Sequence, residues 1–182
     1  MKNDFDVHHL NVAAFARAGG QVAGEARLAQ FERLLQESQG AGGGHVVRYA
    51  VRGEFRANGA AQEAVWLHLS AETALPMTCQ RCLGSVDVPL AFEREYRFVA
   101  TEAQAETEDE HSDEDVLAIS RDFNVLELIE DELLMELPPV PKHDTCPEPV
   151  QLQAVDPDFE DEPAEKPNPF AVLGQLKKRD LS

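Results

Sequence analysis

Residues 79–98, with the sequence CQRCLGSVDVPLAFEREYRF, decide the fold of this chain of 182 residues. Apolar or aromatic side chains occupy alternate positions over most of the stretch, namely Val86, Val88, Leu90, Phe92, Tyr96 and Phe98. Successive side chains of a β-strand point to opposite faces, so this alternation predicts a long strand with one buried face. A Cys-x-x-Cys pair, Cys79 and Cys82, precedes the strand and is predicted to lie in a tight turn.

Two further alternating stretches precede the cysteines. His45 to Ala57 places Val47, Val51 and Phe55 on one face and arginines on the other. Glu63 to Glu72 alternates in the same way, and the turn dipeptide Asn58-Gly59 lies between the two stretches. Three successive strands of this kind predict an antiparallel meander with one covered face.

Helical patterns flank these strands. Residues 11–18 predict a short helix that ends at Gly19-Gly20, an extended piece follows over 21–26, and 28–37 predict a second helix. These two helices are expected to cover the meander. The fold class is therefore α+β.

A short strand over Asp115 to Ile119 and a further helix are predicted beyond the meander. Asn124 is the expected N-cap of that helix, and Pro138-Pro139 ends it. One apolar stripe is formed by Leu126, Ile129, Leu133 and Leu137, while Leu128 and Met135 lie on the other side. A helix with apolar residues on two sides is either deeply buried or used by a partner.

The charge is concentrated in one part of the chain. The net charge is −18, and residues 101–165 hold 22 acidic against 2 basic residues. Residues 101–115 predict an acidic linker without regular structure, and 147–167 predict a disordered acidic tether. A chain of this charge does not bind nucleic acid through bulk electrostatics, so basic proteins are the expected direct partners.

The last residues, 168–182, differ from the tether that precedes them. They predict a short amphipathic helix with a basic end, which is better suited to docking on a partner than to a core. The residues expected to bind that partner are Phe170, Val172, Leu173, Leu176, Lys177 and Lys178.

Two further features bear on location and chemistry. The chain has neither an apolar run long enough to cross a bilayer nor a signal peptide, and three cysteines are an odd number for a disulfide framework, so a cytoplasmic location is expected. The sequence contains no P-loop, GxGxxG, GxSxG or HExxH motif, so neither an enzyme nor a small-molecule substrate is expected.

The cysteines favour a metal site. His143 and Cys146 form a second half-site three residues apart, and two such pairs are suited to a tetrahedral ion. Thiolate and imidazole ligands favour a structural zinc at Cys79, Cys82, His143 and Cys146. Two alternatives stay open, a pair of incidental thiols in a hairpin and a redox dithiol, although a redox role is typical of a Cys-x-x-Cys pair at the start of a helix.

Arginines line the outer face of the first long strand. Arg48, Arg52 and Arg56, together with Arg81 between the cysteines, are candidates for contact with RNA phosphates. The alternative is an ordinary charged sheet face, in which Arg81 either offsets the charge of the thiolates or is solvated.

Three motifs together resemble the YceD family, the large ribosomal RNA subunit accumulation proteins. They are Cys79-Gln80-Arg81-Cys82-Leu83, the stretch from Glu130 through Pro138 to Cys146, and Lys166 to Leu173. The resemblance runs nearly end to end and implies a non-enzymatic factor needed for accumulation of large-subunit (23S) rRNA. Its expected partners are pre-ribosomal large-subunit rRNA, basic ribosomal proteins or assembly factors.

The organisation expected from these patterns has five parts. Residues 1–100 hold the helices, the sheet and the Cys-x-x-Cys hairpin, 101–115 the linker, 116–146 a helix and half-site packed on the same domain, 147–167 the tether and 168–182 the tail. Two other functions remain open. One is an acidic mimic of nucleic acid that binds a ribonuclease or another RNA-binding protein, and the other is a thiol-disulfide redox protein.

Overall fold

The structure, a computed structural model, describes residues 5–58 and 62–147 and confirms the α+β class. The Asn58-Gly59 turn, the tether and the tail with its six partner-binding candidates lie, wholly or in part, outside these residues. The described elements are α1 (Val12–Arg17), β1 (Gln21–Arg27), the 3-10 helix η1 (Leu28–Gln30), α2 (Glu32–Glu37), β2 (Val46–Asn58), β3 (Gln62–Thr78), β4 (Ser85–Val99), α3 (Glu102–Asp109), β5 (Asp115–Ala118) and α4 (Val125–Met135).

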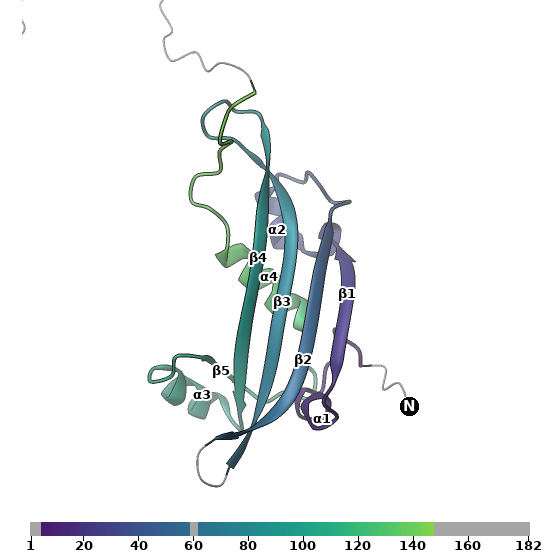
Figure 1. Cartoon of the computed structure of the whole chain (residues 1–182), viewed down its shortest axis with the longest axis vertical. Helices are drawn as coiled ribbons and strands as arrows, with labels where there is room; N and C mark the ends of the chain where they lie inside the picture. The colour runs from purple at the N-terminus through teal and green to yellow at the C-terminus, as the bar shows by residue number, and fades with distance from the viewer. Residues whose placement is uncertain (1–4, 59–61, 148–182) are drawn as a thin grey trace, which may run out of the picture. The chain divides into compact units, whose positions relative to one another are not determined.

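The strands of the described residues form one five-stranded sheet with the order β1-β2-β3-β4-β5 (Figure 1). The predicted meander is confirmed, because β2, β3 and β4 pair antiparallel, for example Val51 with Leu69 and Leu67 with Tyr96. The extended piece at 21–26 becomes β1, which pairs antiparallel with β2. The short strand β5 joins the opposite edge, where it runs parallel to the last residues of β4, Tyr96 to Val99.

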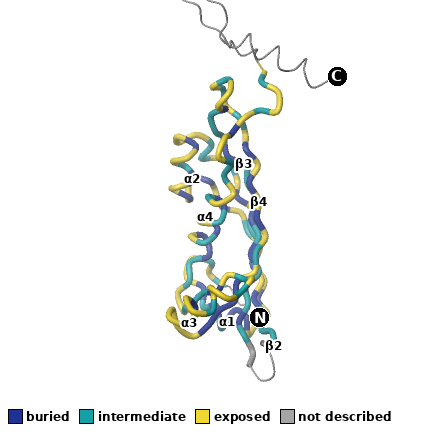
Figure 2. Tube along the Cα trace, turned by 90° about the vertical axis from the view of Figure 1, so that its left-hand side faces the viewer, coloured by how far each residue is buried: buried dark blue, intermediate teal, exposed yellow. Residues whose placement is uncertain are grey.

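The core lies between one face of this sheet and the helices (Figure 2). Strand alternation directs Val51, Leu67 and Tyr96 inward, and α1 and α4 pack against β2, β3 and β4 on that side. Helix α1 approaches β2 so closely that a Cβ at Gly53 would lie 3.0 Å from the backbone of Ala16. A glycine is therefore required where helix and strand meet.

Helix α4 begins as predicted, because the side chain of Asn124 accepts hydrogen bonds from the backbone N–H groups of Leu126 and Glu127. Leu126, Ile129 and Leu133 of its apolar stripe are buried, Leu137 beyond its end is half-buried, and Met135 on the other side is 77% exposed. Glu130 of the same helix is buried as well, which the pattern of carboxylates around the helix does not indicate. Its carboxylate accepts from the N–H of Arg33 at 2.7 Å and the N–H of Leu34 at 3.3 Å, and so caps the first turn of α2.

Residues 101–115 differ from the predicted linker, because they contain α3 and lead directly into β5. The side chain of Thr101 caps α3 by accepting from the N–H of Gln104. Arg97 of β4 then binds carboxylates on both sides of the turn, with Nη1 2.6 Å from Glu108 and Nε 3.1 Å from Glu114. Arg97 lies outside residues 101–115, so the composition of that segment does not reveal it. Its positive charge offsets part of the negative charge of the acidic segment.

Candidate metal centre

The loop between β3 and β4 positions the first two candidate ligands. It closes with two hydrogen bonds of 2.8 Å, from the N–H of Cys79 to the carbonyl of Gly84 and from the N–H of Leu83 to the carbonyl of Cys79. Leu83 adopts a positive φ of 61°, as a tight turn requires. The Cys79 side chain is buried and Cys82 is half-buried, so the predicted hairpin turn presents two thiols from one side of the loop.

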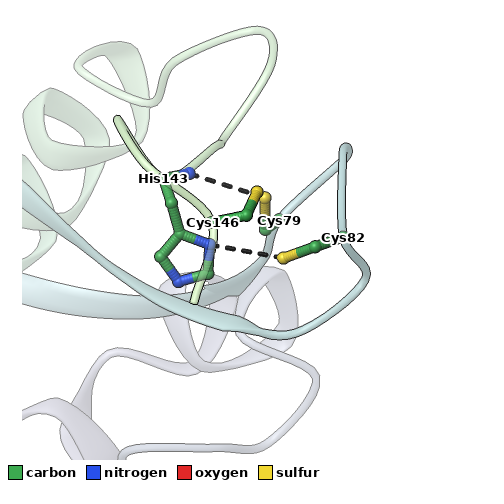
Figure 3. Close-up of side chains that lie close together, drawn as sticks. All are labelled: Cys79, Cys82, His143 and Cys146. Carbon is green, nitrogen blue, oxygen red and sulfur yellow. Dashed lines mark hydrogen bonds between the residues drawn. The ribbon is translucent and has the colours of Figure 1, made fainter. Parts of the chain in front are cut away.

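The segment after α4 brings the second half-site to this loop. The N–H of Gln80 donates to the carbonyl of Pro141 at 2.9 Å, and the N–H of His143 points to Cys79 Sγ at 3.5 Å. One donor atom from each of Cys79, Cys82, His143 and Cys146 then lies within 4.8 Å of the others. Figure 3 shows the four side chains close together, with the cysteines of the loop facing His143 and Cys146. The structure thus brings together the four residues that sequence spacing selects.

The distances suit a tetrahedral ion. Zinc bonds of about 2.3 Å to sulfur and about 2.0 Å to nitrogen place a sulfur and a nitrogen ligand roughly 3.5 Å apart, and Cys82 Sγ lies 3.4 Å from His143 Nδ1. The other ring nitrogen, His143 Nε2, is 2.9 Å from the carbonyl oxygen of Ser85. A proton on Nε2 that is donated to this carbonyl leaves Nδ1 as the ligand atom. The four residues can therefore hold a metal ion.

The electrostatics of the loop favour thiolate. Burial raises the pKa of the Cys79 thiol, but the backbone N–H groups of Cys82, His143 and Arg81 together lower it more, so the net direction is downward. At Cys82 the N–H of Gly84 lowers the pKa, while burial and the nearby sulfurs of Cys79 and Cys146 raise it, and the net direction is upward. Because the three sulfurs are close together, ionisation of one thiol makes ionisation of the next less favourable. A cation bound among them would favour the thiolate form of all three.

Arg81 supplies a positive charge next to the cluster. Its Nε lies 3.2 Å from Cys146 Sγ, and its Nη2 donates to the carbonyl oxygens of His143 and Asp144. The thiolate of Cys146 raises the pKa of Arg81, so the guanidinium stays charged. Three thiolates with a divalent ion carry a net charge of −1, which this arginine offsets. The contacts match the charge-offsetting alternative for Arg81 and leave little of its fork for RNA.

The other three arginines proposed for RNA contact are paired with carboxylates of the same sheet face. Arg48 lies 3.3 Å from Glu25 and 3.5 Å from Glu72, Arg52 lies 2.5 Å from Glu54, and Arg56 lies 2.7 Å from Glu95. Arg52 pairs within β2, whereas Arg48 pairs with carboxylates of β1 and β3 and Arg56 with one of β4. Sequence alternation therefore locates the arginines but not their partners on other strands. The arrangement is that of a charged outer sheet face in which positive and negative groups alternate.

Within the described residues, no helix combines the length and the apolar character needed to span a bilayer. The fold and the cluster define the class of the protein: an α+β sheet protein in which a Cys3His group joins a β-hairpin to a segment more than sixty residues further along the chain.

The chain belongs to the family described as large ribosomal RNA subunit accumulation protein YceD, which matches residues 67–177. A Haemophilus influenzae protein of that name is 31% identical over 121 residues, which are 65% of this chain and 68% of the relative. No solved structure matches the chain. The resemblance stated from three motifs is thus confirmed, and the matched region includes all four residues of the cluster.

Proposed function

We propose that this chain is a non-enzymatic cytoplasmic factor that supports accumulation of large-subunit (23S) rRNA by binding components of the pre-ribosome. Membership of the YceD family, over a match that runs from β3 beyond Cys146, carries this proposal. A Cys3His group with four protein donors suits a structural ion and leaves no position for a substrate. The chain therefore acts by holding a binding surface rather than by catalysis.

A depletion experiment tests the proposal. Cells that lose this protein are expected to lose large-subunit rRNA relative to small-subunit rRNA, and the full chain supplied from a plasmid restores the ratio. Affinity purification of the full chain, with RNA and proteins both identified, then names the bound components. Normal rRNA ratios after complete depletion would contradict the proposal.

The cluster holds a structural zinc in this proposal. Its support is the 3.4 Å spacing between Cys82 Sγ and His143 Nδ1, the second hydrogen bond of His143 and the charge of Arg81. Protein purified without chelators is expected to contain about one equivalent of zinc by elemental analysis. Cys82→Ser and Cys146→Ser are each expected to lower that content well below half an equivalent, whereas Ser38→Ala leaves it unchanged. Metal-free wild-type protein would overturn the zinc assignment.

The direct partner is a basic ribosomal protein or assembly factor. The support is electrostatic: α3 and the turn after it, residues 102–114, hold seven carboxylates and no lysine or arginine, whereas the arginines of the outer sheet face are already paired. Since each phosphate contact requires a local cation, RNA is the less favourable direct ligand for both surfaces.

Neutralising part of α3 tests the partner. Glu102 and Glu106 are exposed on α3, and the double substitution Glu102→Gln and Glu106→Gln is expected to weaken co-sedimentation with large-subunit precursors. The matched control is Glu32→Gln with Glu37→Gln, which removes two exposed carboxylates from α2. Equal loss in both variants would show that only net charge matters.

A second function has support from the same charge distribution. An acidic mimic that binds a ribonuclease or another RNA-binding protein also needs a carboxylate surface without free cations. It predicts that added RNA displaces the captured protein. An assembly factor that contacts a ribosomal protein within the precursor remains bound when free RNA is added.

A further inference from the structure

One edge of β4 is only partly occupied in the described chain. Strand β5 pairs with Tyr96 to Val99, whereas the stretch from Ser85 to Arg94 pairs with β3 on one side alone. The segment from Pro138 to Thr145 runs beside that stretch, as Figure 1 shows, after α4 and before the Cys/His cluster. We call the space between them the β4-edge groove; it has a volume of about 590 Å³ and is lined from β4 by residues 86–89.

Three hydrogen bonds show which backbone groups of β4 face this groove. The carbonyl of Gly84 accepts from the N–H of Cys79, the residue directly after β3, and the β3–β4 register continues from there, so even-numbered residues of β4 bond toward β3. The carbonyl of Ser85 accepts from His143, and the carbonyl of Val99 accepts from Ile119 beyond β5, so odd-numbered residues bond away from β3. The backbone groups of Asp87, Pro89, Ala91 and Glu93 thus point outward, and among the described residues they have no hydrogen-bond partner.

The two faces of this edge differ in chemistry. On the outer face the side chains of Asp87 and Glu93 are exposed, and no described ion pair includes them. On the inner face the groove is lined by apolar side chains, of which Val140 is 55% exposed. The others are Val86, Val88, Pro138 and Pro141.

We propose that the β4-edge groove binds an extended basic peptide of a partner protein, added as a further strand beside β4. This inference rests on the proposed function and names the chemistry of its partner. A strand added there places alternate side chains on the two faces. Those beside Asp87 and Glu93 are basic, and those that enter between Val86, Val88 and Val140 are apolar. The peptide therefore alternates basic and apolar residues.

The occupant follows from charge. Asp87 and Asp144 line the groove with one lysine, Lys142, and the whole chain carries −18. Exposed Glu93 lies further along the same strand. A second copy of the chain would place its own Asp87 and Glu93 at the same edge, where like charges repel. A nucleic acid strand would bring phosphates to the same carboxylates. A basic peptide alone matches both the charge and the unpaired backbone.

One residue of the Cys/His cluster, His143, lines this groove. His143, Asp144 and Thr145 line it, and His143 contacts the carbonyl of Ser85 at its end. A metal held by the cluster therefore fixes the distance between the segment after α4 and β4. A strand that pairs with β4 lies about 4.8 Å from it. If the segment at 138–145 is released, the site loses the apolar side chains of that segment but keeps the backbone groups of the β4 edge.

The test uses the zinc-loaded full chain and a fluorescent peptide of alternating lysine and valine, long enough to pair from Asp87 to Glu93. Two control peptides have the same composition. One has its lysines and valines in separate blocks, and the other carries N-methyl groups on the amides that would face β4. The alternating peptide is expected to bind about tenfold or more tightly than either control. Equal binding of all three would show attraction by bulk charge and overturn the proposal.

Variants of the chain locate the site. Val140→Asp is expected to weaken binding of the alternating peptide about tenfold or more, and the matched control Val46→Asp, at another exposed valine on β2, leaves it unchanged. Pro89→Ala restores an N–H donor to the edge and is expected to tighten binding about fivefold. If neither Val140→Asp nor Pro89→Ala changes peptide binding, the β4-edge groove is excluded as the site. It is also excluded if single-stranded RNA binds more tightly than the peptide and displaces it.

The outcome is separable from that of the proposed function. If Val140→Asp abolishes peptide binding but the variant still co-sediments with large-subunit precursors, the groove is not the ribosomal contact and the proposed function stands. If wild-type protein binds the peptide but depletion leaves rRNA ratios normal, the groove stands and the proposed function fails.

Discussion

The two ends of β4 are completed in different ways. At its C-terminal end β5 pairs with Tyr96 to Val99, and Arg97, whose side chain is 7% exposed, binds Glu108 and Glu114. At its N-terminal end the neighbouring segment makes one backbone contact, Gln80 to Pro141, together with the Cys/His cluster. The first end is completed by a paired strand and by the ion pairs of Arg97. The second end depends on the Cys/His cluster and Arg81, and in the part of the chain that the structure describes it leaves residues 85–94 of β4 paired on one side only.

This difference indicates where the protein can respond to its surroundings. An ion-pair network with a buried arginine is intrinsic to the chain and always present near neutral pH. A cluster of thiols and an imidazole gains its full stability only with a bound cation. We therefore expect binding at the β4-edge groove to depend on the metal, whereas the acidic surface of α3 at the opposite end should keep its structure without it.

The largest expected effect is removal of the metal. Chelation, or Cys82→Ser, should release the segment at 138–147 and destabilise it locally by about 3 kcal/mol or more, which corresponds to roughly 150-fold faster amide exchange. The N–H groups of Gln80 and His143 report on this end. The N–H of Ala105 in α3 is the internal control. Equal acceleration at both ends would mean that the ends are not independent.

Arg97→Ala should break the opposite end. The loss of Arg97 leaves Glu108 and Glu114 without their cation, and because about a third of each carboxylate is exposed, we expect a cost of about 2–3 kcal/mol rather than the larger cost of a fully buried pair. Urea unfolding of metal-loaded protein measures it. Arg48→Ala, at a pair with both side chains 63% exposed, should cost about 0.5 kcal/mol or less. Similar losses for both arginines would contradict the contrast between buried and exposed pairs.

Arg81→Ala should weaken metal binding up to about tenfold. The substitution removes the charge beside Cys146 and the donors to the carbonyls of His143 and Asp144. Competition with a metal chelator of known affinity measures the change. Arg81→Lys keeps the positive charge but not the planar guanidinium with its several donors. Its metal affinity should therefore lie between those of wild type and Arg81→Ala. Wild-type metal affinity in both variants would mean that Arg81 is solvated and does not contribute to metal binding.

The smallest expected effect is the pH dependence of the outer sheet face. Hydrogen bonds from Arg56 and His68 lower the pKa of Glu54 to about 2. Because the folded pKa is below the ordinary value of about 4.3, this stabilisation is complete above about pH 5 and is lost as the pH falls toward about 2.

We expect Glu54→Gln to be about 1 kcal/mol less stable than wild type at neutral pH, after allowance for solvent screening, and to approach wild type near pH 2. Urea midpoints across this range test it, and acid release of the metal makes a metal-free background necessary. A constant difference between the two proteins at every pH would contradict the assignment.

Much of the fold could be predicted because its signals are local. Alternation over 86–98 located β4, Asn124 located the start of α4, and Gly19-Gly20 located the end of α1. The candidate metal residues could also be selected, since each half-site has its own short spacing. The predicted linker at 101–115 differs from the helix that forms, because its stabilising partner, Arg97, belongs to another element.

The sequence by itself determined the faces of the strands, the caps and breaks of the helices, and the family. Only the tertiary structure decided that Arg48, Arg52 and Arg56 face carboxylates, that Glu130 caps α2, and that no described strand pairs with the edge of β4 beside the Cys/His cluster. The physical reason is the range of the interactions. Side-chain periodicity and capping act over a few residues, whereas ion-pair partners, sheet edges and the meeting of two half-sites depend on segments far apart in the chain.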